Sequence, residues 1–193
     1  MRATSLAFLL IGAGIGFGVM YSMMKDKAPE IVRAEPTPFV PPPNAAAPAA
    51  KPPIDQQRVA QLEKAVQTNP KDFDSLIELG FTYFEQQNFQ QAVSWYTKAL
   101  DVRPNDAGVR TDLGTALYNV GRVDDALVEF RKSLGYEPNQ PQALFNLGAV
   151  LMEEKNDRKG ALDAFEKLVA SHPEFPQIAV VKQQIALLKE PQK

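Results

Sequence analysis

"LGFTYFEQQNFQQAVSWYTKALDVRP", residues 79–104, is the stretch that decides the fold. Its apolar residues recur at helical spacing on both sides of a polar turn near Asn88, which predicts two amphipathic helices. Small residues, Gly80, Ala92 and Ala99, stand on the apolar faces where a core helix usually carries bulk. Residues of this size allow two helix backbones to approach closely. We therefore predict a tightly packed antiparallel helix pair.

The same pattern recurs along the chain. Pro70, Pro104 and Pro138 are 34 residues apart, and Pro173 follows after 35, with the additional residue in "NDRKG" at 156–160. A helix-turn-helix period of this length indicates a solenoid of stacked units. The other landmarks keep the same phase: Leu79-Gly80, Leu113-Gly114 and Leu147-Gly148; Ala92, Ala126 and Ala161; Tyr96, Phe130 and Phe165.

This spacing of leucine-glycine, alanine, aromatic and proline residues resembles the tetratricopeptide repeat (TPR) family over three full units. The resemblance covers about residues 55–190 and implies an all-α, right-handed superhelical α-solenoid of about three helix pairs with flanking helices. The units that we predict are a half repeat at 55–72, repeats at 73–106, 107–140 and 141–175, and a capping helix at 176–190.

Packing expectations follow from these positions. We expect the glycines of the first helices to face the alanines of the second, with the aromatic residues in the wider gaps. Ala99 and Ser133 are expected to let the next unit pack closely, and Leu168 departs from this pattern before the terminal helix. The prolines are expected to stop each second helix, and the pairs Asn105-Asp106 and Asn139-Gln140 to offer polar caps for the helices that follow. The apolar side of the capping helix comprises Ile178, Val181, Ile185 and Leu188.

The N-terminal region has a different character. Residues 5–24 contain no charged residue, and 20 residues match the length of a membrane-spanning helix. We predict an uncleaved anchor at 1–27, giving an all-α protein with an N-terminal transmembrane helix. A signal peptide is the alternative, although its apolar stretch is usually shorter. Glycines spaced by four residues either form a homodimer contact between such helices or reflect the tolerance of membrane helices for glycine: Gly12, Gly14, Gly16 and Gly18.

Residues 28–54 contain 9 of the 16 prolines and 7 alanines, which favours an extended, disordered spacer between membrane and repeats. "FVPPP" also has the composition of a peptide ligand. We predict a single-pass protein of the bacterial inner (plasma) membrane with its TPR domain outside the cytoplasm. The charges that flank the span, Arg2 against Lys25 and Lys27, are nearly balanced and leave the orientation open.

Several function classes are disfavoured. The chain has no cysteine and one histidine, His172, so thiolate metal sites and multi-histidine zinc sites are excluded. A net charge of −2 leaves no basic face for nucleic acid. We find no phosphate-binding loop and no nucleophile beside a base, so we expect no enzyme activity, no cofactor and no metal. The carboxylate pairs Asp124-Asp125 and Glu153-Glu154 are expected to be solvated charge.

The TPR resemblance implies that the first helices line a concave surface that binds proteins. The residues that it places there as peptide-binding are Ile77, Phe81, Phe84, Thr111, Thr115, Tyr118, Asn119, Phe145, Asn146 and Met152. Further positions on this surface are Asp74, Glu78, Glu85, Asp112, Gln142, Ala149 and Glu153. Apolar residues interleaved with acids suit a helix or extended peptide with apolar anchors and basic flanks. The alternative for each aromatic residue is packing between helices.

Two narrower comparisons refine the prediction. TPR proteins that clamp the carboxylates of chaperone C-termini use lysine, arginine and asparagine side chains. This chain has Ile77, Phe81, Asp112 and Gln142 at most of those positions and keeps only Asn146, so that ligand is disfavoured. The repeats behind a membrane span resemble bacterial TPR proteins of cytochrome c biogenesis, which implies an adaptor that brings assembly components together. The alternative is an architectural subunit of an envelope complex that self-associates through its glycine-rich span.

Overall fold

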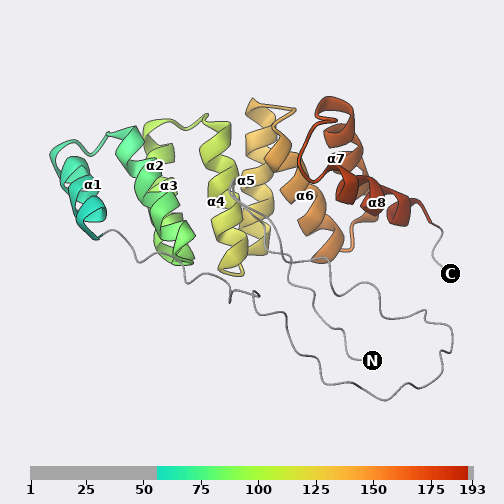
Figure 1. The fold of residues 1–193 in the computed structure, drawn as a ribbon, viewed down its shortest axis with the longest axis horizontal. Coiled ribbons are helices and arrows are strands. Elements are labelled where there is room, and N and C mark those ends of the chain that lie inside the picture. The colour runs from blue at the N-terminus through green and yellow to red at the C-terminus, as the bar shows by residue number, and fades with distance from the viewer. Residues whose placement is uncertain (1–55, 191–193) are drawn as a thin grey trace, which may run out of the picture.

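The computed structural model describes residues 56–190, and the predicted anchor (1–27) and linker (28–54) lie outside this range. The described part contains eight α-helices and no strand (Figure 1). Within it, no helix has both the length and the apolar character needed to span a membrane. The helices are α1 (Gln56–Thr68), α2 (Phe73–Glu85), α3 (Phe89–Val102), α4 (Ala107–Asn119), α5 (Val123–Tyr136), α6 (Pro141–Glu153), α7 (Arg158–Ser171) and α8 (Ile178–Lys189).

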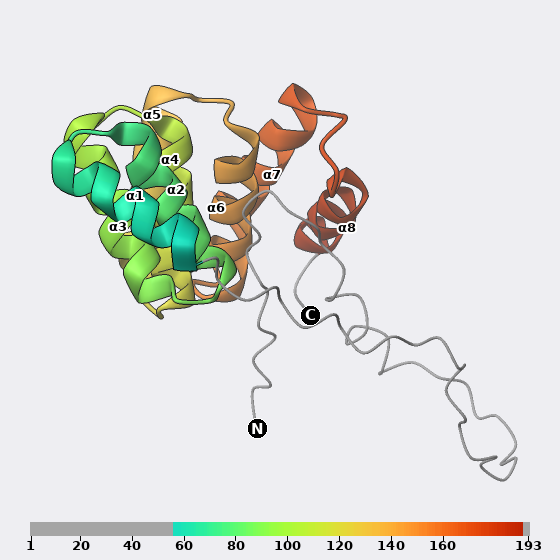
Figure 2. The same cartoon turned by 60° about the vertical axis from the view of Figure 1, so that its left-hand side comes forward.

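The helices stack in chain order along the long axis of the molecule (Figures 1 and 2). Three pairs form the main contacts, α2 with α3, α4 with α5 and α6 with α7, and the pairs join through α3–α4 and α5–α6. Two flanking helices complete the stack, α1 against α2 and α8 against α7. The predicted all-helical TPR solenoid is confirmed, while its right-handed twist and the unit boundaries remain predictions.

The helix ends follow local sequence signals. The second helix of each pair (α3, α5 and α7) and the flanking helix α1 end two residues before a proline. The proline ring disfavours continuation of the helix. Side-chain caps open most helices: Asp106 accepts a hydrogen bond from the amide of Val109 at 2.9 Å, and Gln140 caps α6 in the same way. Gly121 adopts a φ of +82° in the turn before α5, which favours glycine.

The packing of the glycines corrects one expectation. A methyl group at Gly80 would lie 2.5 Å from Cε1 of Tyr96, and Gly114 and Gly148 meet Phe130 and Phe165 in the same way. Ring carbons are therefore the closest atoms to the side-chain position of each glycine, whereas we predicted that the rings would fill wider gaps. The reason is that an aromatic ring reaches across the helix pair and lies flush only against a backbone without Cβ.

Both flanking helices cover an end of the stack, as an array of repeats requires. Helix α1 buries Val59 and Leu62, and its remaining positions are mostly polar. Helix α8 buries Val181 and Leu188, which confirms the predicted apolar side. Leu168, fully buried, belongs to the same core cluster as these two residues of α8.

Candidate functional site

We call the surface formed by the first helices α2, α4 and α6 the first-helix face. Phe81 is its most exposed aromatic residue, with 48% of its surface accessible. The other predicted site residues that remain partly accessible there are Ile77, Phe84, Tyr118, Asn119, Phe145 and Met152. Asp112 and Glu153 are also partly accessible, so apolar and acidic side chains share one surface.

Three predicted peptide-binding residues, Thr111, Thr115 and Asn146, are buried between helices. The amide of Asn146 on α6 donates to the hydroxyl of Thr115 on α4 at 2.9 Å. Thr111 shares a hydrogen bond with Ser133 on α5, also at 2.9 Å. These side chains join helices and do not line an open surface, so their contribution to a ligand site is at most indirect.

Two of the aromatic residues also pack inside the domain. The ring of Phe145 lies 5.6 Å from that of Phe175 and 6.4 Å from that of Phe165, between centroids. Phe84 contacts Phe89 edge to face at 5.1 Å. Partial packing holds these rings in place and leaves Phe81 as the large apolar side chain on α2 that is free to contact a partner.

Charge is distributed unevenly between the two layers of helices. The second helices α3, α5 and α7 carry six acidic and six basic residues. The first helices carry a single base, Arg110, and it is bonded to Glu129 of α5 and to the carbonyl of Pro104. Their acids number five: Asp74, Glu78, Glu85, Asp112 and Glu153. The first-helix face is therefore acidic, although the domain as a whole contains both signs.

Two of these acids are poorly solvated. Burial, together with the charge of Asp106, raises the pKa of Asp112 to about 7. Burial, together with the charge of Glu154, raises the pKa of Glu153 to about 8. One carboxylate oxygen of Glu153 is buried and has no hydrogen-bond partner among the described residues. The expectation that the pair Glu153-Glu154 is solvated was wrong for Glu153, because burial separates one of its oxygens from solvent.

Tyr96 is a core residue, as the sequence analysis predicted, but its hydroxyl adds a polar group that the prediction did not consider. Its side chain is 2% exposed and its hydroxyl makes no hydrogen bond with any described residue. Burial, the charge of Asp112 on α4 and the charge of Glu85 on α2 all raise the pKa of Tyr96. The ring of Tyr96 lies against Gly80 of α2. The sequence carried one signal for this hydroxyl: position 96 is a tyrosine, whereas the equivalent positions are Phe130 and Phe165.

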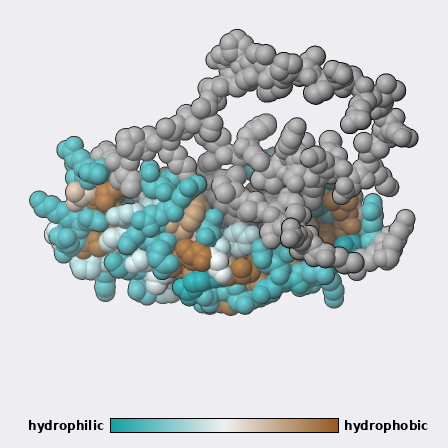
Figure 3. Space-filling model, turned by 90° about the horizontal axis from the view of Figure 1, so that it is seen from below, coloured by the Kyte–Doolittle hydropathy of each residue, from teal (hydrophilic) through white to brown (hydrophobic). Residues whose placement is uncertain are grey.

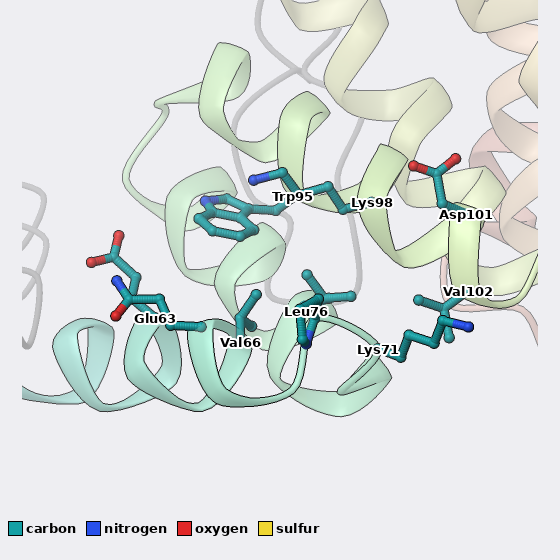
Figure 4. A pocket seen from close by; sticks show the side chains of 10 residues that line it. Glu63, Val66, Lys71, Leu76, Trp95, Lys98, Asp101 and Val102 are labelled. Atoms are coloured by element: carbon teal, nitrogen blue, oxygen red, sulfur yellow. The ribbon is translucent and has the colours of Figure 1, made fainter.

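A separate hollow of about 710 Å³ lies between α1 and α3 (Figure 4). Trp95 of α3 lines it together with Val66 of α1 and Leu76 of α2. The ammonium of Lys98 lies 3.9 Å from the centroid of the Trp95 ring, and the indole nitrogen is buried without a hydrogen-bond partner in the described part of the chain. Most of its lining comes from α1 and α3, and none of the predicted peptide-binding residues lines it.

One face of the described part of the chain is largely polar. Seen from below, hydrophilic side chains dominate and hydrophobic patches are small (Figure 3). Residues 56–190 contain no group of three or more histidine, cysteine, aspartate or glutamate residues placed to hold a metal ion. Apolar contact and hydrogen bonding to carboxylates are thus the chemistry that the first-helix face offers.

Comparisons with solved structures show the same fold. A crystal structure of MamA aligns with a TM-score of 0.62 at 21% identity, over 67% of this chain and 74% of that chain. YrrB, described as a TPR protein with an unusual peptide-binding site, aligns with a TM-score of 0.58 at 24% identity, over 65% and 64%. The TPR domain of Arabidopsis OM64 aligns with a TM-score of 0.55 at 18% identity, over 61% and 93%.

Sequence comparisons identify the family. No curated protein sequence matches the chain. One family model, described as TPR repeat, matches residues 82–121, and a second, described as tetratricopeptide repeat, matches residues 111–177. Together the two matches run from the last turn of α2 to the residues that follow α7. The repeat-bearing part of this chain, residues 82–177, belongs to the tetratricopeptide repeat family.

Proposed function

We propose that this protein is a non-catalytic adaptor whose first-helix face binds a peptide segment of a partner protein. The observation that carries the proposal is the exposed ring of Phe81 within a surface whose acids outnumber its bases. A partner with an apolar anchor and basic flanking residues complements this surface. The description of YrrB, which has the same fold, supports a peptide as the class of ligand.

The setting of this adaptor is part of the proposal. The uncharged stretch 5–24 supports tethering to a bacterial inner membrane, with 28–54 as spacer and the repeats outside the cytoplasm. The sequence resemblance to TPR proteins of cytochrome c biogenesis supports a role in assembling c-type cytochromes. Glycine spacing within the span supports a homodimer through Gly12, Gly14, Gly16 and Gly18.

The test uses the full chain in detergent and a phage library of random dodecapeptides. Peptides that are selected are synthesised, and their affinities are measured by fluorescence anisotropy for the wild type, Phe81→Ala and Val128→Ala. Val128 is a matched control, because it is 45% exposed but lies on the second helix α5. We expect Phe81→Ala to weaken binding about tenfold or more and Val128→Ala to leave it unchanged. Equal affinities for all three proteins, or no selected peptide, reject the proposal.

A further inference from the structure

We infer that the hollow beside Trp95 is a docking site for a proline-rich segment of the same chain, residues 36–43, "PTPFVPPP". The segment lies outside the described residues, in the sequence that precedes α1. Docking would shorten the predicted spacer between the membrane and the repeats. None of the predicted peptide-binding residues lines the hollow, so this inference does not depend on the proposed function.

The hollow has the size and the lining of a binding groove. Its volume of about 710 Å³ lies within the range of roughly 300–1,000 Å³ that ligand pockets occupy. The ring of Trp95 is partly exposed, and Figure 4 shows it across the hollow from Val66 and Leu76. Val102, also partly exposed, extends the apolar lining along α3. The hollow therefore offers one aromatic ring among aliphatic side chains.

The charges around the hollow are balanced. The lining includes two acids, Glu63 and Asp101, and two bases, Lys71 and Lys98. The exposed side chain of Lys98 already places its ammonium 3.9 Å from the centroid of the Trp95 ring. No excess charge of either sign selects a strongly charged ligand, so an uncharged, apolar segment is the complementary occupant.

Residues 36–43 have this character. They contain five prolines, one threonine, one phenylalanine and one valine, and no charged residue. Phe39 is the only aromatic residue in the whole stretch 28–54. Consecutive prolines favour the polyproline II helix, which loses little entropy on binding, and such segments dock in grooves lined by aromatic side chains. The segment and the hollow thus match in chemistry.

The length of chain between the segment and α1 permits docking. Residues 44–55 separate Pro43 from Gln56, where α1 begins, and these 12 residues span at most about 40 Å when extended. Glu63, at the near end of the hollow, follows Gln56 by seven residues, or about 10 Å along the helix. The chain can therefore turn back along α1. A segment tethered at this distance has an effective concentration in the millimolar range, which favours it over free ligands.

The experiment uses two properties of the sequence. Trp95 is the only tryptophan, and the chain has no cysteine. A nitroxide spin label on an introduced cysteine quenches tryptophan fluorescence on close contact, so it reports when the labelled position reaches the hollow. The label is attached to the full chain in detergent, either at Thr37→Cys within the segment or at Ala47→Cys outside it. Both positions precede residue 56, so neither substitution alters the packing of the repeats.

The two labels distinguish docking from tethering. Thr37 is ten residues further from α1 than Ala47, so a chain that does not dock should quench Trp95 less from Thr37. Docking should make quenching from Thr37 at least as strong as quenching from Ala47. Weaker quenching from Thr37 would overturn the inference.

A second pair of variants tests the sequence of the segment. In the chain labelled at Thr37→Cys, the double substitution Phe39→Ser and Pro42→Ser should lower quenching about twofold or more, because it removes the aromatic anchor and breaks the proline run. The matched control, Ala45→Ser with Ala49→Ser, lies outside the segment and should leave quenching unchanged. Equal quenching in both double variants would overturn the inference.

A mixing experiment identifies the chain that supplies the segment. A labelled chain that carries Trp95→Phe is mixed with unlabelled wild-type chain, so that only contact between two copies quenches fluorescence. We expect no quenching in this mixture. Quenching would assign the hollow to the segment of a second copy and would overturn docking within one chain. Each of these outcomes leaves peptide binding to the first-helix face, measured with Phe81→Ala, unaffected.

Discussion

The amide of Asn146 reaches from α6 to the hydroxyl of Thr115 on α4 and links the second and third helix pairs. The hydroxyl of Thr115 in turn donates to the carbonyl of Thr111. The side-chain amide of Gln142 donates to the side-chain oxygen of Asn146 at 2.9 Å. The first helices of adjacent units are thus connected by a continuous chain of hydrogen bonds. Asn146 is its central member and is fully buried.

Asn146→Leu is expected to destabilise the domain. The substitution removes the donor to Thr115 and the acceptor for Gln142, and it leaves both groups with one partner fewer. We expect a loss of roughly 1–3 kcal/mol in the free energy of unfolding, measured by urea denaturation. Gln142→Leu, at the partly exposed end of the chain of hydrogen bonds, is the control and should cost less. An unchanged stability of Asn146→Leu would show that these hydrogen bonds contribute nothing net.

Two glycine-to-alanine substitutions separate the effect of side-chain packing on stability from the effect of helix propensity. Gly80→Ala places a methyl group 2.5 Å from the ring of Tyr96, and we expect a loss of roughly 1–3 kcal/mol because the ring must shift. Gly135 has no atom within 4 Å of the same methyl position. Gly135→Ala should therefore stabilise α5 by about 0.5–1 kcal/mol. Thermal unfolding of the two variants measures both effects, and destabilisation of equal size would contradict the packing argument.

The repeats were predictable because their signals are local. Proline restricts the backbone and glycine has no side chain wherever they stand, so the phase of Pro104 and Gly80 along the sequence is enough to indicate helix ends and close contacts. The partner of each glycine was not predictable in the same way. Which side chain lies against Gly80 depends on the crossing of two helices, and helical spacing allows both Ala92 and Tyr96 on the facing side.

The candidate site was predictable only in part. Exposure of Phe81 followed from its register on the first helix. Burial of Asn146 and desolvation of Glu153 could not be read from register, because both depend on how closely the neighbouring unit approaches. That the hydroxyl of Tyr96 has no hydrogen-bond partner likewise depends on which groups surround it in space, and the sequence does not give them.

Glu153 makes stability depend on pH. Its pKa is about 8 in the folded protein against an ordinary value of 4.5, so the folded state binds more protons than the unfolded state between these values. The contribution of Glu153 to stability should therefore be complete below about pH 4.5 and be lost as the pH rises to about 8. Tyr118 on α4 and Glu154 are the groups that face it, and Asp112 adds a change of the same sign up to about pH 7.

Glu153→Gln is expected to reduce this dependence. A neutral amide retains the shape of the side chain and removes the cost of charging it. Urea midpoints at pH 5 and pH 8 should differ less for the variant than for the wild type, with Asp125→Asn as an exposed control that leaves the difference unchanged. A difference in Glu153→Gln as large as in the wild type would show that burial of Glu153 does not control this response.

Arg158 should stabilise the terminal helix α8 in its folded form. Its Nη2 donates to the carbonyls of Leu187, Leu188 and Glu190 at 3.1, 2.7 and 3.0 Å, and so satisfies the end of α8 from the first turn of α7. Arg158→Ala removes the cation and these bonds at once. Amide hydrogen exchange in α8 should accelerate, and global stability should fall by about 1–2 kcal/mol.

The neighbouring Lys159 provides the control, since it is exposed and has no hydrogen bond or ion pair in the described part of the chain. Lys159→Ala should leave exchange in α8 unchanged. Because α8 buries Val181 and Leu188 against the last repeat, loss of its C-terminal cap should also expose this end of the stack. Exchange in α1, at the opposite end, should change only as far as global stability does. Equal protection of α8 in wild type and Arg158→Ala would mean that apolar burial alone holds the terminal helix in place.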